Sequence, residues 1–75
     1  MLFFKSKGEK ELESIVFELQ MNLENNYKDS AHNARKRLLL RCGELLANKK
    51  ISRKTYDKYV RIYNEYTEKM KNYHH

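Results

Sequence analysis

Cys42 is the first residue of this chain that could do chemistry, because it is the only cysteine among the 75 residues. A catalytic thiol needs a base within hydrogen-bond reach and some access to substrate. His32 precedes it by ten positions in the sequence and falls on a different side of a helix. We therefore predict that Cys42 is a small apolar residue of the core.

Metal and cofactor sites are not expected either. A di-metal site in a helical bundle uses two Glu-x-x-His motifs, and the chain has no such pair. A phosphate-binding loop needs several nearby glycines, whereas Gly8 and Gly43 are isolated. His74 and His75 are either native or a tag remnant and carry no argument. With no paired acid and base, we expect no enzyme, no cofactor, no metal and no small-molecule substrate.

The tyrosines between Tyr56 and Tyr66 recur at three- and four-residue spacing. Tyrosine rings can stack on bases or line a peptide groove. The spacing, however, is that of a buried helical stripe. We predict that these rings lie in the core while their hydroxyls reach the surface.

Positive charge is concentrated in the middle of the chain. Residues 27–61 hold eleven Lys or Arg against three Asp or Glu, whereas residues 1–26 hold three Lys against five Glu. Such a segment is either the solvated surface of a basic protein or a contact for nucleic-acid phosphates. The candidate contacts are Arg35, Lys36, Arg37, Arg41, Lys49, Lys50, Arg53, Lys54 and Lys58. Because they point to several sides of their helices, the pattern favours solvation.

A local pattern within residues 51–60 resembles the start of the recognition helix in bacterial helix-turn-helix proteins, and the resemblance spans residues 45–60. It implies that four side chains would meet DNA in the major groove: Ser52, Arg53, Lys54 and Lys58. The chain departs from that family in the turn, where Lys50 replaces the usual glycine. Lys49 also stands where an apolar residue is usual.

The elements that must position these residues are helices. The chain has no proline, only two glycines and many strong helix formers. Its length allows one domain with a thin core. We predict an all-α, three-helix bundle with helices near 8–25, 29–47 and 53–72, the second and third forming a short-turn hairpin.

Capping residues predict where the first helix begins and ends and where the second begins. Ser6 and Glu9 have capping-box spacing, which predicts the start of the first helix. The segment 25–26, Asn-Asn, is expected to end it, although one long bent helix is the alternative. Asp29 or Ser30 is then the expected cap of the second helix.

The third helix is expected to begin after Ser52. Ile51 and Tyr56 flank that cap at hydrophobic-staple spacing.

Each predicted helix has one apolar stripe. The stripe of the first helix is Leu12, Ile15, Val16, Leu19 and Leu23. The second has Ala31, Ala34, Leu38, Cys42 and Leu45, widened by Leu39 and Leu46. The third has Tyr56, Tyr59, Val60, Tyr63, Tyr66 and Met70.

Four residues do not fit these stripes. Phe17 and Met21 lie on the side of the first helix opposite its stripe, which suggests a second neighbour. That neighbour is another helix, the segment 2–4 folding back, or a second protomer. Leu40 and Gly43 lie on the outer side of the second helix. They are either a surface leucine beside a tolerated glycine or a close contact with another chain.

These observations lead to two functional hypotheses. The first is a non-enzymatic protein-interaction module that self-associates or binds another protein through Phe17, Met21, Leu40 and Gly43. The alternative is nucleic-acid binding by the basic surface of residues 35–58.

The location expected is cytoplasmic, because there is one cysteine, no apolar stretch long enough for a membrane, and charge already at Lys5. Residues 1–5 are expected to be an N-terminal segment and 74–75 a tag remnant or disordered tail.

Overall fold

Three α-helices make up the part of the chain that the computed structural model describes, residues 5–71. Helix α1 spans Lys7–Glu24, α2 spans Lys28–Ala47 and α3 spans Arg53–Met70. No residue in this range belongs to a strand. The predicted all-α fold is confirmed, and each helix boundary lies within two residues of its expected position.

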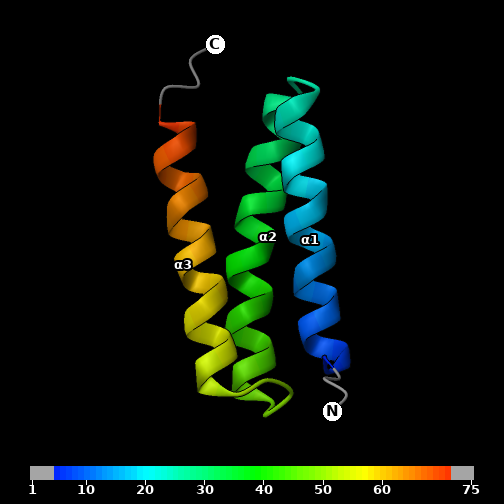
Figure 1. The fold of residues 1–75 in the computed structure, drawn as a ribbon, viewed down its shortest axis with the longest axis vertical. Helices are drawn as coiled ribbons and strands as arrows, with labels where there is room; N and C mark the ends of the chain where they lie inside the picture. Colours follow the sequence, from blue (N-terminus) through cyan, green and yellow to red (C-terminus); the bar gives the residue numbers. More distant parts are fainter. Residues whose placement is uncertain (1–4, 72–75) are drawn as a thin grey trace.

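Helix α2 lies between α1 and α3 and runs antiparallel to both (Figure 1). It packs against each of them, whereas the backbones of α1 and α3 approach one another less closely. The predicted hairpin of α2 and α3 is confirmed, because the two helices run side by side along their lengths. They do not form the steep corner that characterises a helix-turn-helix motif.

The core follows the inward sides of the three helices. One buried cluster joins all three helices through Leu12, Ile15, Leu38, Cys42, Leu45, Ile51 and Tyr59. A second, nearer the α1–α2 turn, consists of Leu19, Ala31, Ala34 and Met70. The apolar stripes predicted for α1 and α2 therefore face the core, with the exception of Leu39. Along α3 only Tyr59 and Met70 are fully buried, and the other tyrosines of the stripe are half-buried.

Serine side chains cap α1 and α3 as expected. The Oγ atom of Ser6 accepts a hydrogen bond from the Glu9 N–H at 3.1 Å, and Ser52 Oγ accepts one from the Thr55 N–H at 3.1 Å. The Glu9 carboxylate does not complete a capping box, because it points toward Lys58 on α3. Ile51 is buried in the cluster against which Tyr56 also packs, consistent with the expected staple.

The break between α1 and α2 is real, but its cap was predicted wrongly. Asn26 has φ 61°, the left-handed conformation that asparagine tolerates and that ends a helix. The Ala31 N–H already bonds the carbonyl oxygen of Tyr27 at 2.9 Å, so Tyr27 is the N-cap residue. Asp29 and Ser30 therefore lie inside the first turn of α2.

Gly8 lies at a close contact between α1 and the α2–α3 turn. A methyl group on its Cα would lie 3.0 Å from Ile51 Cγ2, 3.3 Å from Leu45 Cδ2 and 3.3 Å from the Lys50 carbonyl oxygen. The first of these contacts is too short for an undisturbed structure, and the last involves backbone. Gly8 thus sets how closely the start of α1 can rest on the turn.

Replacing Gly8 by alanine is expected to lower the free energy of unfolding by about 1 kcal/mol, because crowding outweighs the better helix propensity. Gly43→Ala is the matched control, since a methyl group there meets no heavy atom within 4 Å. That control should raise the free energy of unfolding by up to ~1 kcal/mol. Urea titrations of dilute protein, followed by circular dichroism, measure both changes. Equal stabilisation by the two substitutions would show that Gly8 is not at a tight contact.

Candidate protein-interaction surface

Two of the residues that did not fit the core stripes lie on the outer side of α1. The side chains of Phe17 and Met21 are 64% and 40% exposed, respectively. No other helix of residues 5–71 covers them. The segment 2–4, which was considered as a cover, lies outside the described residues. The two side chains form an exposed apolar pair on an otherwise polar helix side.

The other two lie on the outer side of α2. Leu40 is 62% exposed, and the space above Gly43 is open. Leu39 is 38% exposed, so the prediction that it widens the core side was wrong, whereas Leu46 does pack against the core. Arg35, four residues before Leu39, is the side chain that reaches α3. Its guanidinium donates hydrogen bonds to Tyr63 Oη at 3.0 Å and Thr67 Oγ1 at 3.1 Å.

A shallow hollow follows this outer side of α2, and we call it the α2 outer strip. It is lined by Lys36, Leu39, Leu40, Gly43, Glu44 and Ala47. Its middle is apolar, with an ammonium group toward one end and a carboxylate at its edge. Lys36 was predicted only as a nucleic-acid contact, and Ala47 was not predicted in any interface. Their four-three-four spacing with Leu40 and Gly43 is the signal that could have identified them.

Acidic residues of α1 pair with two arginines proposed for nucleic-acid contact. Arg41 donates to both carboxylate oxygens of Glu11, and its Nη1 lies 2.6 Å from Glu44. Arg37 pairs with Glu18. The hydrogen bonds from the Arg41 guanidinium lower the pKa of Glu11 below its usual value. These charges therefore neutralise each other along the α1–α2 junction.

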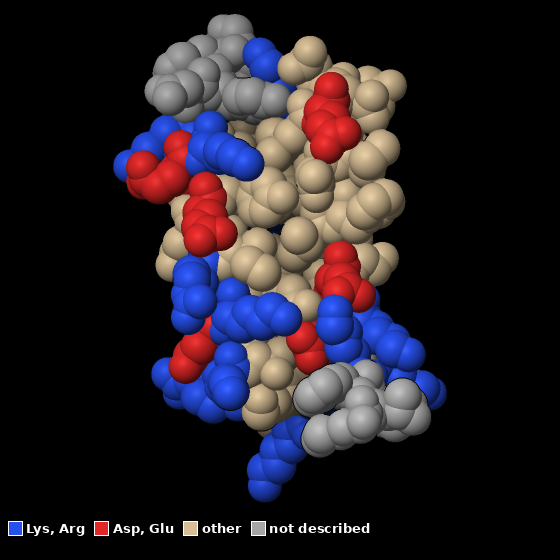
Figure 2. Space-filling view, in the orientation of Figure 1, with Lys and Arg blue, Asp and Glu red and all other residues tan. Residues whose placement is uncertain are grey.

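The remaining basic candidates divide into paired and unpaired groups. Arg53 contacts Asp57 at 3.1 Å, and Lys58 contacts Glu9 at 3.2 Å. Among residues 5–71, four of the nine candidates form none of these ion pairs or side-chain hydrogen bonds: Lys36, Lys49, Lys50 and Lys54. Figure 2 shows Lys and Arg gathered toward the end where the α2–α3 turn lies. The structure thus brings only part of the predicted basic surface together.

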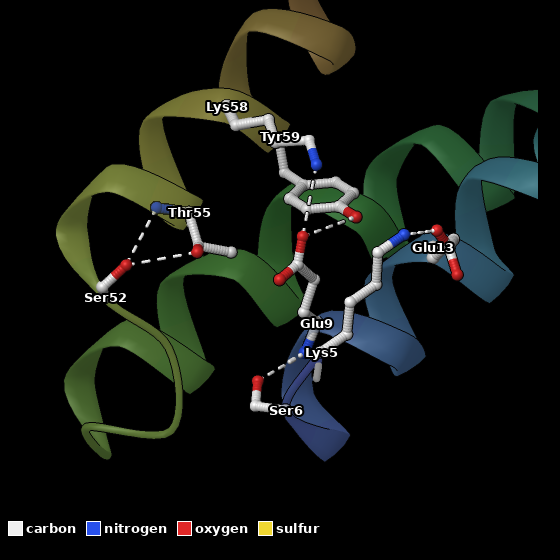
Figure 3. A network of polar contacts seen from close by, with 8 residues as sticks. All are labelled: Lys5, Ser6, Glu9, Glu13, Ser52, Thr55, Lys58 and Tyr59. Atoms are coloured by element: carbon white, nitrogen blue, oxygen red, sulfur yellow. Dashed lines mark hydrogen bonds and ion pairs between the residues drawn. The ribbon is translucent and has the colours of Figure 1, made fainter. Parts of the chain in front are cut away.

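Glu9 links α1 to α3 at this same end (Figure 3). Its carboxylate receives the Lys58 ammonium at 3.2 Å and the Tyr59 hydroxyl at 3.5 Å. Burial, followed by the nearby charge of Glu9, raises the pKa of Tyr59 to about 12. This hydroxyl therefore stays protonated near neutral pH and acts as a donor in a structural contact.

The Cys42 thiol is not activated as a nucleophile. Cys42 is fully buried, and burial raises the pKa of its thiol to about 11, which keeps the reactive thiolate scarce. Within residues 5–71, no three His, Cys, Asp or Glu side chains are grouped so that they could hold a metal ion. None of the three helices has an apolar stretch that could cross a membrane.

A shallow groove between the last turns of α1 and α3 was not anticipated. It is lined by Gln20, Leu23, Glu24, Tyr66, Lys69 and Met70. Burial raises the pKa of the Tyr66 hydroxyl at its edge. The groove arises because α1 and α3 approach only loosely, and spacing along one helix cannot reveal that.

Comparison of this chain with protein-family models, curated proteins and solved structures found no match.

The Arg41–Glu11 contact should make stability depend on pH in the acidic range. The carboxyl of Glu11 has a folded-state pKa below its usual 4.5, so its stabilising contribution is complete above that value. The contribution is lost as pH falls through the lowered pKa. In Arg41→Met, the pKa of Glu11 should return toward 4.5, and the stability difference from wild type should shrink below about pH 4.

Carboxyl titration by NMR measures the first change, and urea titrations at pH 7 and pH 3 measure the second. Arg53→Met is the control, because its exposed contact with Asp57 does not involve Glu11. An unchanged Glu11 pKa in Arg41→Met would contradict the assignment.

Proposed function

We propose that this chain is a non-enzymatic protein-interaction module that self-associates. The observation that carries the proposal is the exposure of two large apolar side chains, Phe17 at 64% and Leu40 at 62%, on the outer sides of two packed helices. Each has a second exposed apolar side chain near it, Met21 beside Phe17 and Leu39 beside Leu40. A second copy offers the same kind of surface in return.

The size of the core supports the same conclusion. Only eleven apolar residues of the described part are buried, two of them alanines and one the cysteine. A domain of this length buries a small share of its surface, so partner chains often supply part of its stability. Burying a phenylalanine or leucine fully contributes about 1.5–3 kcal/mol. Covering Phe17 or Leu40 would therefore be a large addition to a modest total.

Self-association should appear as a concentration-dependent sedimentation coefficient between low and high micromolar protein. Phe17→Glu and Leu40→Glu each place a charge in one apolar surface, and at least one of them should shift the dissociation constant by tenfold or more, since burying an unpaired charge is costly. Analytical ultracentrifugation measures the shift.

Asn64→Glu is the matched control, because it adds the same charge to an exposed position of α3 away from both surfaces. It should leave the dissociation constant unchanged. A wild-type chain that stays monomeric at several hundred micromolar would overturn the proposal.

A second candidate function is weak binding of nucleic acid at the basic end. The observation in its favour is that Lys49, Lys50 and Lys54 lie near the first turn of α3 without an ion pair to any of residues 5–71. Against it, Arg35, Arg37, Arg41, Arg53 and Lys58 already contact protein groups.

This candidate predicts a shallow salt dependence. Three phosphate contacts give a slope of log K against log salt of about −3, whereas all nine candidate residues would give about −8. Fluorescence anisotropy with duplex DNA and RNA at two salt concentrations measures the slope. The double variant Lys49→Glu/Lys50→Glu should abolish binding, and Lys69→Glu, in the last turn of α3 at the opposite end of the molecule, serves as its control. Absence of binding at low salt would eliminate this candidate.

A further inference from the structure

We infer that the α2 outer strip is the contact between two copies of this chain, and that the two α2 helices meet antiparallel. The inference rests on the proposed self-association and specifies its surface and geometry. Three features of the strip support it: the open space at Gly43, the charges at its ends, and the contrast with the outer side of α1.

The open space at Gly43 has no use within one copy. A glycine in the middle of an exposed helix costs about 1 kcal/mol relative to alanine, and no heavy atom of the described chain lies within 4 Å of where its Cβ would be. Leu40, one turn away, is a protruding side chain without a cover. When two strips pair about a two-fold axis midway between these residues, Leu40 of each copy fills the space over Gly43 of the other.

The charged residues of the strip are complementary under the same rotation. Lys36 precedes the axis midway between Leu40 and Gly43 by about one and a half turns of helix, and Glu44 follows it by less than one turn. Antiparallel pairing about this axis places Lys36 of each copy about 4.5 Å along the axis from Glu44 of the other, an offset that the long lysine side chain can span, and the contact occurs twice per dimer. Glu44 also contacts Arg41, but a carboxylate accepts several hydrogen bonds. Parallel pairing would instead place Lys36 beside Lys36.

The basic end of the molecule favours the antiparallel orientation as well. Lys49 and Lys50 directly follow α2. In an antiparallel pair centred near Leu40 and Gly43, these lysines of the two copies lie roughly 20 Å apart along the axis at 1.5 Å per residue. That separation exceeds two Debye lengths at physiological salt, so their repulsion is screened. A parallel pair would bring them together.

The outer side of α1 offers no comparable space for a side chain of a second copy. The only glycine of α1, Gly8, is buried against the α2–α3 turn rather than beside Phe17 and Met21. Glu13 and Glu18, which flank Phe17, are already paired with Lys5 and Arg37 of the same chain. The α2 outer strip is therefore the better surface for a second copy.

The test exploits the charge pattern. Lys36→Glu and Glu44→Lys each create like-charge contacts at both ends of the strip. Each should therefore raise the dissociation constant of the dimer about tenfold or more. The double variant Lys36→Glu/Glu44→Lys reverses both charges and should recover most of the wild-type affinity. An equimolar mixture of the two single variants should also dimerise, because every contact between them joins opposite charges. Sedimentation equilibrium measures all four samples.

A variant that does not weaken the monomer separates association from folding. Gly43→Gln replaces glycine by a better helix former, so its thermal midpoint at low micromolar concentration should not fall. Its side chain fills the space that Leu40 of the other copy would occupy, so dimerisation should weaken at least tenfold.

Each outcome decides between the surfaces. Weakened single variants and a restored double variant support the antiparallel strip. Dimerisation that is equal in all of these variants overturns the strip but leaves self-association through another surface, to which Phe17→Glu would then be sensitive. Weakened single variants without restoration, or a mixture that fails to dimerise, overturn the antiparallel geometry. A monomeric wild-type chain overturns both this inference and the proposed function.

Discussion

The inward side of α2 is the surface on which the whole fold depends. Ala31, Ala34, Leu38 and Cys42 are completely buried there, because α1 covers one half of this side and α3 the other. Neither outer helix has another extensive apolar surface to pack against, since α1 and α3 approach each other loosely. Loss of packing along α2 would therefore separate both helix pairs at once, and we expect the three helices to unfold as one unit.

Electrostatics reinforces this packing and at the same time removes much of the apparent basic character. The acidic residues of α1 and the arginines of α2 meet along the antiparallel pair, as in Glu11–Arg41 and Glu18–Arg37. Exposed ion pairs contribute little free energy individually. Their greater effect is on the surface potential, because the charge excess of residues 27–61 is partly neutralised by residues 1–26. A charge count along the sequence therefore overstates how strongly this surface attracts phosphate.

Local patterns were sufficient to predict most of the fold. The caps Ser6 and Ser52, the left-handed Asn26 and the core stripes of α1 and α2 each depend on residues a few positions apart, where helix geometry determines what is near. The Arg35–Tyr63 and Arg41–Glu11 contacts join residues 28 and 30 positions apart, so their geometry appears only once the helices are packed. The same limit explains the wrong expectation for Leu39, because its exposure depends on where the packed helices lie.

The candidate surface could be predicted in part for a related reason. Phe17, Met21 and Leu40 were identified because they lie opposite buried residues on the same helix, which is local information. An apolar residue on the outer side of a helix remains exposed unless another segment of the chain packs over it. Here α3 is held to the inward side of α2 by Tyr59 and Met70, and no described segment remains for the outer side.

The central helix α2 therefore has two sides with apolar residues. The inward side is buried within the chain, and the outer side is exposed. A helix of that kind is ordinarily found inside a larger assembly, because water favours polar residues on an exposed side. Gly43 sharpens this argument. Alanine at that position would fit without contact and would stabilise α2 by about 1 kcal/mol. Glycine at position 43 does not stabilise a single copy. It does leave room for the leucine side chain of a second helix that packs against α2. In the proposed dimer, the open space at Gly43 and the protruding Leu40 form two halves of one contact.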